Sequence, residues 1–421
     1  MYTLLQQPEF IDRHRTKPTA FTRTRKLPFH SLCLFLLNLV KGSTQCELDN
    51  FFSVFNQQEN ETRFVTTSAF SQAREYLKHT AFTELNDVFL TQCYQQIPTQ
   101  TWRGHRLLAV DTSTLLLPDS DAITEHFGGL EGTYGLRNMG RLSTCYDVYN
   151  GLTLDIQIAP YLDSERELAI KHLHKTTAQD LLLYDRGYPG YWFFAMHQKM
   201  NRHFCIRASK TFSSQIKAFV ASTQQESLIS FQPTKEHRSA CLAHDIPAEP
   251  VTLRVMKIPL SSGEIEILIT SLVDEKNYPY EEFHDLYGRR WGIEVDFDFK
   301  KNVIEIENFT GLSVHSVLQD ISAKVLTQNI VMAAALVAKI DMVERYAKRR
   351  LSYKVNISHG ISKMKNILVK MFVHEKPVEV FKAYVNILMR TVEAVRLGRS
   401  FARTLSSWHT NRSHQNIKRA R

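Results

Sequence analysis

Cysteine is scarce in this sequence of 421 residues, and no two cysteines have the spacing of a metal-binding pair. The six are Cys33, Cys46, Cys93, Cys145, Cys205 and Cys241. Zinc fingers need closely spaced Cys or His ligands, and small secreted scaffolds need many disulfides, so the sequence predicts neither class. Scattered thiols of this kind are typical of a reducing cytosol, where they stay free.

The signatures of several common enzyme and membrane classes are also missing. The sequence has no glycine-rich dinucleotide loop, no Walker P-loop and no serine-hydrolase nucleophile elbow. The longest early apolar run, residues 32–40, is too short to span a bilayer, and no signal peptide is predicted. We therefore expect a cytoplasmic protein with no membrane partner, long enough for more than one compact domain.

Positive charge is abundant but unevenly distributed. The formal net charge is +9, and residues 341–421 hold 18 Lys or Arg against five Asp or Glu. A second basic cluster lies near the start of the chain, at Arg13, Arg15, Lys17, Arg23, Arg25 and Lys26. Basic patches attract polyanions, and counterion release supplies much of the affinity for DNA. The charge favours nucleic acid, although a solvated basic tail would have the same composition.

The apolar pattern predicts helices at both ends of the chain. Residues 1–27 are polar and basic and are expected to be extended, whereas residues 28–97 have helical periodicity. Within that stretch, short helices before a helix capped near Thr66 could form a helix-turn-helix or a plain helical bundle. Further helices are predicted over residues 280–302 and 314–339, followed by the basic C-terminal region.

The middle of the chain alternates between strand-like and helix-like segments. Strands are predicted at residues 106–111, 142–148, 152–159, 181–185 and 203–207. Asn150-Gly151 predicts a hairpin between the second and third, because both residues tolerate positive φ. Ser164 and Glu167 form a capping-box pattern for a helix, and an aromatic-rich helix is predicted to end near Met200. This order, an α/β pattern, is that of the ribonuclease H-like fold.

Two of these strands end in an aspartate, at Asp111 and Asp185. Strand ends in α/β folds point into the crevice where ligands bind, so the two carboxylates could meet. Carboxylates held close together repel each other unless a divalent cation neutralises them, and Mg²⁺ prefers such oxygen ligands. For either residue alone, a turn or a helix cap is the simpler interpretation.

A third acid, Glu294, lies in a segment with further polar residues at helical spacing. Tyr287, Arg290, Glu294 and Lys301 are three, four and seven positions apart, which places them on one face of an α-helix. Such a stripe suits a DNA phosphate beside a metal ion, because Arg290 can grip phosphate oxygens and Lys301 supplies a point charge. The alternative is a surface helix with ordinary ion pairs such as Arg290–Glu294.

The stripe resembles the Tyr-(2)-Arg-(3)-Glu-(6)-Lys signature of bacterial insertion-sequence transposases of the DDE type. Asp185-Arg-Gly-Tyr188 and Asp111-Thr-Ser-Thr resemble the motifs around the two aspartates of that family. The resemblance covers about residues 28–340. It implies that Asp111, Asp185 and Glu294 are catalytic and bind two Mg²⁺ ions, with Mn²⁺ able to substitute. It also implies that Tyr287, Arg290 and Lys301 contact DNA.

The same resemblance implies the reaction and the partners. The enzyme would cleave transposon ends by hydrolysis and join the freed 3′-hydroxyl to target DNA, in a two-metal mechanism. Its partners would be double-stranded DNA, as terminal inverted repeats and as target, and a second copy of the chain in a synaptic homodimer. It would act in the bacterial cytoplasm, associated with the nucleoid when bound to DNA.

The predicted domain organisation has four regions. Residues 1–100 form a helical DNA-binding region, and residues 101–208 and 279–340 form the ribonuclease H-like catalytic domain. Residues 209–278 form a β-rich insertion, and residues 341–421 form a basic helical region. Two alternative functions remain: a metal-dependent nuclease on the same fold that cuts without joining, and a non-enzymatic DNA-binding protein derived from a transposase.

Overall fold

The computed structural model describes residues 1–23, 25–58, 63–132, 135–373 and 376–396. It divides into two compact units. Unit 1 comprises Met1–Thr99, Leu115–Gly140 and Asp298–Arg421, and unit 2 comprises Gln100–Thr114 and Arg141–Phe297. The predicted basic residues beyond position 396 lie outside the described residues.

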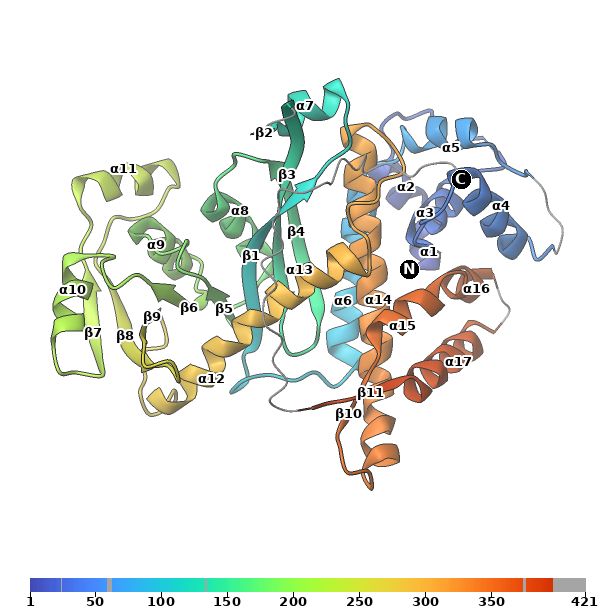
Figure 1. The fold of residues 1–421 in the computed structure, drawn as a ribbon. Coiled ribbons are helices and arrows are strands. Elements are labelled where there is room, and N and C mark those ends of the chain that lie inside the picture. Colours follow the sequence, from blue (N-terminus) through green and yellow to red (C-terminus); the bar gives the residue numbers. More distant parts are fainter. Residues whose placement is uncertain (24, 59–62, 133–134, 374–375, 397–421) are drawn as a thin grey trace. The chain divides into compact units, whose positions relative to one another are not determined.

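A mixed sheet forms the framework of unit 2 (Figure 1). Its strand order is β3-β1-β5-β6-β9-β8-β7, with β4 paired to β3. The bounds are β1 (Arg106–Leu116), β3 (Gly135–Asp147), β4 (Leu152–Pro160), β5 (Asp180–Tyr184), β6 (His203–Ala208), β7 (Glu226–Phe231), β8 (Val251–Pro259) and β9 (Ile265–Thr270). β1, β5 and β6 run parallel, whereas β9, β8 and β7 pair antiparallel. All five residues of β5 are buried, as expected for a central parallel strand.

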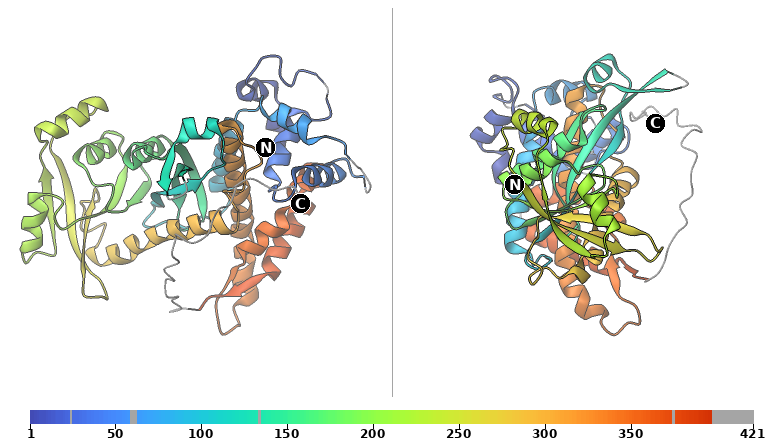
Figure 2. Two further views of the ribbon diagram at one scale, coloured as in Figure 1. Left: turned by 45° about the horizontal axis from the view of Figure 1, so that its top comes forward. Right: turned by 90° about the vertical axis from the view of Figure 1, so that its left-hand side faces the viewer.

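The strands of the predicted insertion continue this sheet. In the right-hand view of Figure 2, β7, β8 and β9 face the viewer. β9 pairs with β6, and the apolar face shared by β5, β6, β8 and β9 forms one core with α12. The segment predicted to be rich in β-structure thus contains β7, β8 and β9.

Helices and 3₁₀ turns connect the strands of unit 2. They are α8 (Glu165–His172), η1 (Leu173–Lys175), α9 (Tyr191–Lys199), α10 (Ser214–Ala221), α11 (Lys235–Ala243), η2 (Tyr280–Glu282), α12 (Phe283–Gly288), η3 (Arg289–Trp291) and α13 (Gly292–Asn302), whose last residues belong to unit 1. The continuous helix predicted over residues 280–302 is wrong, because η3 interrupts it between Gly288 and Gly292. Glycine stabilises a helix poorly, which favours a tighter turn at this point.

One local prediction in unit 2 also needs correction. Ser164 is the N-cap residue of α8, but its side chain makes no capping hydrogen bond, so the predicted capping box does not form. His172, at the end of the same helix, is fully buried between Asp155 (2.6 Å) and Ser143 (3.0 Å). The predicted Asn150-Gly151 hairpin is confirmed, with Gly151 at φ 71°.

Unit 1 is largely helical, with a long helix at its centre (Figure 1). Its elements are α1 (Tyr2–Leu5), α2 (Pro8–His14), α3 (Phe29–Leu37), α4 (Thr44–Phe55), α5 (Thr67–Arg74), α6 (Thr80–Gln96), α7 (Asp121–Phe127), β2 (Gly129–Gly132, paired with β3), α14 (Val314–Tyr346), β10 (Tyr353–Val355), α15 (Ile357–Met364), α16 (Ile367–Val373), α17 (Pro377–Arg390) and β11 (Val392–Ala394). α14 packs against α3, α6, α15 and α17. The extended conformation predicted for residues 1–27 is wrong where α1 and α2 form, because Leu5 and Phe10 are buried in this core.

The apolar composition of α14 explains why this helix lies in the core of unit 1. Among the described residues it is the one helix whose length and composition would allow it to cross a membrane, over Val314–Met342. Of its most apolar window, 83% is buried inside the protein, as in the core helix of a soluble protein.

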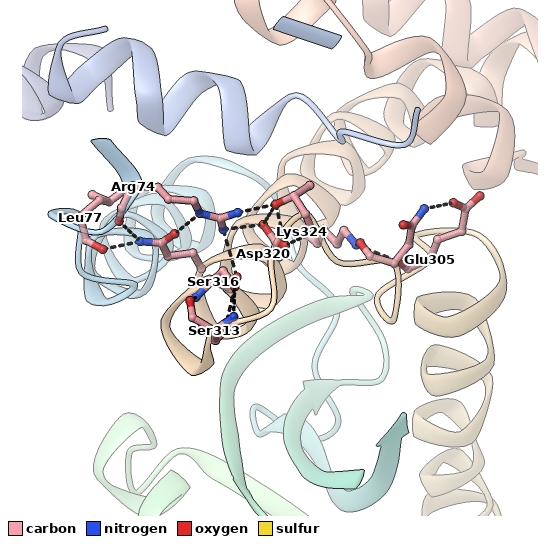
Figure 3. Close-up of polar contacts among 10 residues, drawn as sticks. Arg74, Leu77, Glu305, Ser313, Ser316, Asp320 and Lys324 are labelled. Atoms are coloured by element: carbon pink, nitrogen blue, oxygen red, sulfur yellow. Dashed lines mark hydrogen bonds and ion pairs between the residues drawn. The ribbon is translucent and has the colours of Figure 1, made fainter. Parts of the chain in front are cut away.

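A buried polar network fastens α5 to the start of α14 (Figure 3). Arg74 forms an ion pair with Asp320 at 3.0 Å and donates to Gln319 (2.9 Å) and Thr310 (2.6 Å). Burial alone would raise the pKa of Asp320, but Arg74 and Lys324 hold it below the ordinary value. The carboxylate is therefore ionised and paired inside the core.

Candidate active site

The two predicted aspartates lie at the same level of neighbouring parallel strands. β1 pairs with β5 so that Leu108 lies beside Leu182 and Ala109 beside Leu183. Asp111 and Asp185 each follow two residues after the last of these pairs, and the charge of Asp185 acts on Asp111, so the two carboxylates are close. Adjacent strands are about 4.8 Å apart, so the two carboxylates share one edge of the sheet. The sequence predicts that the first strand ends at Asp111, but β1 continues to Leu116, so Asp111 lies within the strand.

Asp111 is largely buried, with 22% of its side chain exposed. Its Oδ1 accepts a hydrogen bond from the backbone N–H of Thr112 at 2.8 Å. Burial raises the pKa of Asp111 to about 6, and the charges of Asp185 and Glu165 add to this, whereas Thr112 and Arg290 oppose it. The repulsion between carboxylates expected from the sequence is therefore present.

Asp185 follows β5 directly and faces a cation from the next strand. The Nε of Arg207 on β6 lies 3.3 Å from Asp185 Oδ1 in an ion pair. This buried oxygen nevertheless has no hydrogen bond of good geometry among the described residues. Arg207 also donates to Glu266 at 2.7 Å. The sequence reasoning missed Arg207, although its position at the end of the strand beside β5 was a usable signal.

Arg290 links the third acid to the first. Its Nη2 donates to Glu294 Oε1 at 3.0 Å, and its Nη1 lies 3.5 Å from Asp111 Oδ2. Arg290 is only 7% exposed, and the charges of Asp185 and Asp111 contribute to its raised pKa, against the effect of burial. Three acids distant in sequence thus surround one cationic side chain.

Tyr287 and Lys301, the other members of the predicted stripe, have partners inside the protein. The Tyr287 hydroxyl donates to the carbonyl of Tyr184 at 3.1 Å, immediately before Asp185. Burial raises the pKa of Tyr287 well above its ordinary value. Lys301 belongs to unit 1, where its Nζ lies 3.9 Å from Glu307 and burial lowers its pKa. Tyr287 on α12, Arg290 on η3 and Glu294 on α13 therefore all belong to unit 2.

The residues fit a divalent cation in donor chemistry. Among the described residues, no three His, Cys, Asp or Glu side chains are already close enough to hold a metal ion. However, the buried atoms Asp185 Oδ1 and Arg290 Nη1 make no hydrogen bond of good geometry to any described residue. A bound ligand can therefore still interact with both atoms. Asp111, Asp185 and Glu294 offer only oxygen atoms, the ligands that hard cations prefer.

Comparisons with known proteins identify the family that this chain resembles. The family model for the transposase DDE domain matches residues 102–330, more than half of the chain. The chain is 23% identical over 315 residues to the transposase InsG for insertion sequence element IS4 of Escherichia coli (strain K12), covering 72% of this chain and 68% of that protein. A solved piggyBac transposase synaptic complex with hairpin DNA is 10% identical, with a TM-score of 0.46 over 92% of this chain and 84% of the other. That structural likeness is too low to support an argument.

Proposed function

Because this chain belongs to the transposase DDE domain family and is a DNA transposase, we propose that Asp111, Asp185 and Glu294 are its catalytic residues. The observation that carries the proposal is the parallel register of β1 and β5, which brings two aspartates 74 positions apart to one edge of the sheet. The salt bridges of Arg290 to Asp111 and Glu294 support the third assignment.

The three carboxylates would hold divalent cations, Mg²⁺ in two sites or Mn²⁺ in its place. When bound, these cations would supply Lewis-acid activation of an oxygen nucleophile and stabilise the leaving oxygen of the phosphodiester. Arg207 offsets the charge of Asp185 and orients its carboxylate. Arg290 keeps a buried positive charge among the acids, which suits a phosphate oxygen.

The DNA contacts follow the family signature. Arg290 and Lys301 would bind phosphates near the cleaved end, and Tyr287 would contact DNA from the same stripe. The hydrogen bond from the Tyr287 hydroxyl to Tyr184 supports a second task, which is to hold α12 against the end of β5. Terminal inverted repeats and target DNA would be the substrates, handled by a synaptic homodimer in the cytoplasm.

The finer fold assignment belongs to the same proposal. The order of β1, the β3–β4 hairpin, α8, β5, α9 and β6 supports a ribonuclease H-like catalytic domain over residues 101–208 and 279–340. Residues 209–278 would be its insertion, with residues 1–100 and 341–421 as flanking DNA-binding and basic regions.

The test is cleavage and strand transfer on paired DNA ends with the D185N variant. We expect both reactions to fall by about a thousandfold or more, which is about 4 kcal/mol of lost transition-state stabilisation. DNA binding should be retained, because the change removes one charge without altering the side-chain shape. Asp245→Asn, at a fully exposed position, is the matched control.

The outcomes separate the alternative functions. Unchanged activity in D185N would refute the catalytic assignment. Cut ends without joined product in the wild-type protein would identify a nuclease, and binding without cleavage would identify a DNA-binding protein.

A further inference from the structure

A fourth carboxylate lies beside the turn that carries Asp185. Glu165 is the first residue of α8, and its Oε2 is 3.8 Å from the point where a Cβ on Gly187 would lie. The neighbouring Arg166 donates to the Gly187 carbonyl at 3.2 Å. The turn itself is closed by the Tyr188 N–H, which donates to the Asp185 carbonyl at 3.2 Å. The N-terminus of α8 and the turn from Asp185 to Tyr188 are therefore packed together.

Arg141 on β3 sets the orientation of Glu165. Its Nη1 pairs with Glu165 Oε1, while its Nε and Nη2 donate to the Tyr161 carbonyl at 3.2 and 3.1 Å. One carboxylate oxygen of Glu165 is thus engaged, and the other faces Gly187. The Glu165 side chain is 42% exposed, so this ion pair contributes little to stability.

A buried hydroxyl points to a ligand here. Tyr188 is only 1% exposed, and its hydroxyl lies near the Thr112 side chain but makes no hydrogen bond of good geometry among the described residues. Burial is the main cause of the raised pKa of Tyr188. Asp111 and Glu165 are both close enough for their charges to raise it further. A buried polar atom without a partner is costly, and a bound water or ion commonly explains one.

We propose that Glu165 supplies a fourth carboxylate to the divalent-cation site, acting with Asp111 beside the hydroxyl of Tyr188. This inference rests on the proposed function, because it assumes that Asp111 and Asp185 bind cations. A further carboxylate makes the net charge of the site more negative, which favours binding of a second cation. The Tyr188 hydroxyl is then a ready partner for a water or carboxylate oxygen at the site.

The test is Mn²⁺ binding to the full-length protein without DNA, followed by electron paramagnetic resonance. We expect E165Q to weaken the binding of Mn²⁺ by on the order of tenfold. Glutamine keeps an oxygen acceptor for Arg141, so the local fold should persist. Glu167→Gln is the matched control, since Glu167 lies on the same helix and pairs with His244 at 3.1 Å. Its Mn²⁺ affinity should equal that of the wild type.

D185N measured in the same way separates this inference from the proposed function. If D185N loses Mn²⁺ binding and E165Q does not, Glu165 is not a ligand, while the proposed function stands. Equal losses in E165Q and E167Q would also overturn the inference, because the effect would then be general. If D185N binds Mn²⁺ and cleaves DNA like the wild type, the proposed function itself fails. Should E165Q not fold, E165D, which keeps the charge but shortens the reach, is expected to bind more weakly than the wild type.

Discussion

At the scale of single residues, Asp111 combines burial with a negative charge that the protein only partly compensates. Burial is the main reason that its pKa rises to about 6, from an ordinary value of 3.8. Because the folded-state pKa lies above the unfolded value, protonated Asp111 favours the folded state. That contribution is complete below about pH 4 and is lost as the pH rises through about 6. At neutral pH, the ionised carboxylate therefore lowers the free energy of unfolding.

Asp111→Asn should accordingly stabilise the metal-free protein at pH 7. We expect the free energy of unfolding to increase by about 1–3 kcal/mol, since one pKa unit corresponds to about 1.4 kcal/mol and the side chain is partly exposed. Asparagine can still accept the hydrogen bond from Thr112. Urea unfolding in the presence of a chelator, at pH 7 and below pH 4, measures the effect.

The low-pH measurement is the internal control for this prediction. Below pH 4, Asp111 is protonated in both states, so the advantage of D111N should disappear. A variant less stable than the wild type at pH 7 would show that the Arg290 ion pair outweighs the cost of burying the charge. A gain in stability with a loss of activity is the usual trade-off at an active site.

At the scale of elements, the polar network of Figure 3 holds two helices of unit 1 together. Arg74 ends α5, and its partners Gln319 and Asp320 lie in α14. The side chains of Arg74 and Asp320 are 6% and 3% exposed. Removing one member of a buried ion pair leaves the other charge without compensation, which costs more than the pair itself contributes.

Arg74→Met should therefore lower the free energy of unfolding by about 3–5 kcal/mol. Lys41→Met provides the comparison, because Lys41 pairs with Glu305 at 3.0 Å with both side chains more than one-third exposed. That change should cost no more than about 1 kcal/mol. Chemical denaturation of both variants gives the two values. Similar losses in R74M and K41M would mean that the buried network has no special role in stability.

At the scale of the whole molecule, the net positive charge matters for DNA binding. Residues 397–421 contain six Lys or Arg and no Asp or Glu. Each phosphate that a cationic side chain neutralises adds about 0.9 to the slope of log affinity against log salt concentration. The C-terminal segment should therefore contribute to affinity without adding sequence specificity.

A chain that ends at residue 396 should bind DNA more weakly and with a shallower salt dependence. Titration of a labelled duplex at several salt concentrations measures the slope, which we expect to fall by about 0.9 for each phosphate that is no longer neutralised. A full-length variant with the six basic residues replaced by Gln separates charge from length. An unchanged slope in both variants would place the DNA-binding charge elsewhere.

Sequence patterns alone located much of the fold and of the candidate site. The apolar runs before Asp111 and Asp185 predicted β1 and β5, and Asn150-Gly151 predicted the hairpin turn. These features depend on side-chain alternation and turn chemistry, which are local along the chain. The positions of Glu294 and its neighbours followed from a family signature of fixed spacing.

Tertiary structure decided the features that depend on which surfaces become buried. The register that brings Asp111 beside Asp185 exists only once β1 and β5 pair, and the positions of Arg290 between two acids and of Glu165 beside Gly187 arise from packing. The burial of His172 was likewise invisible in a polar helical pattern. Local sequence determines the conformations that a segment favours, whereas contacts between distant residues are selected by the burial of the whole core, and no short window of sequence contains that information.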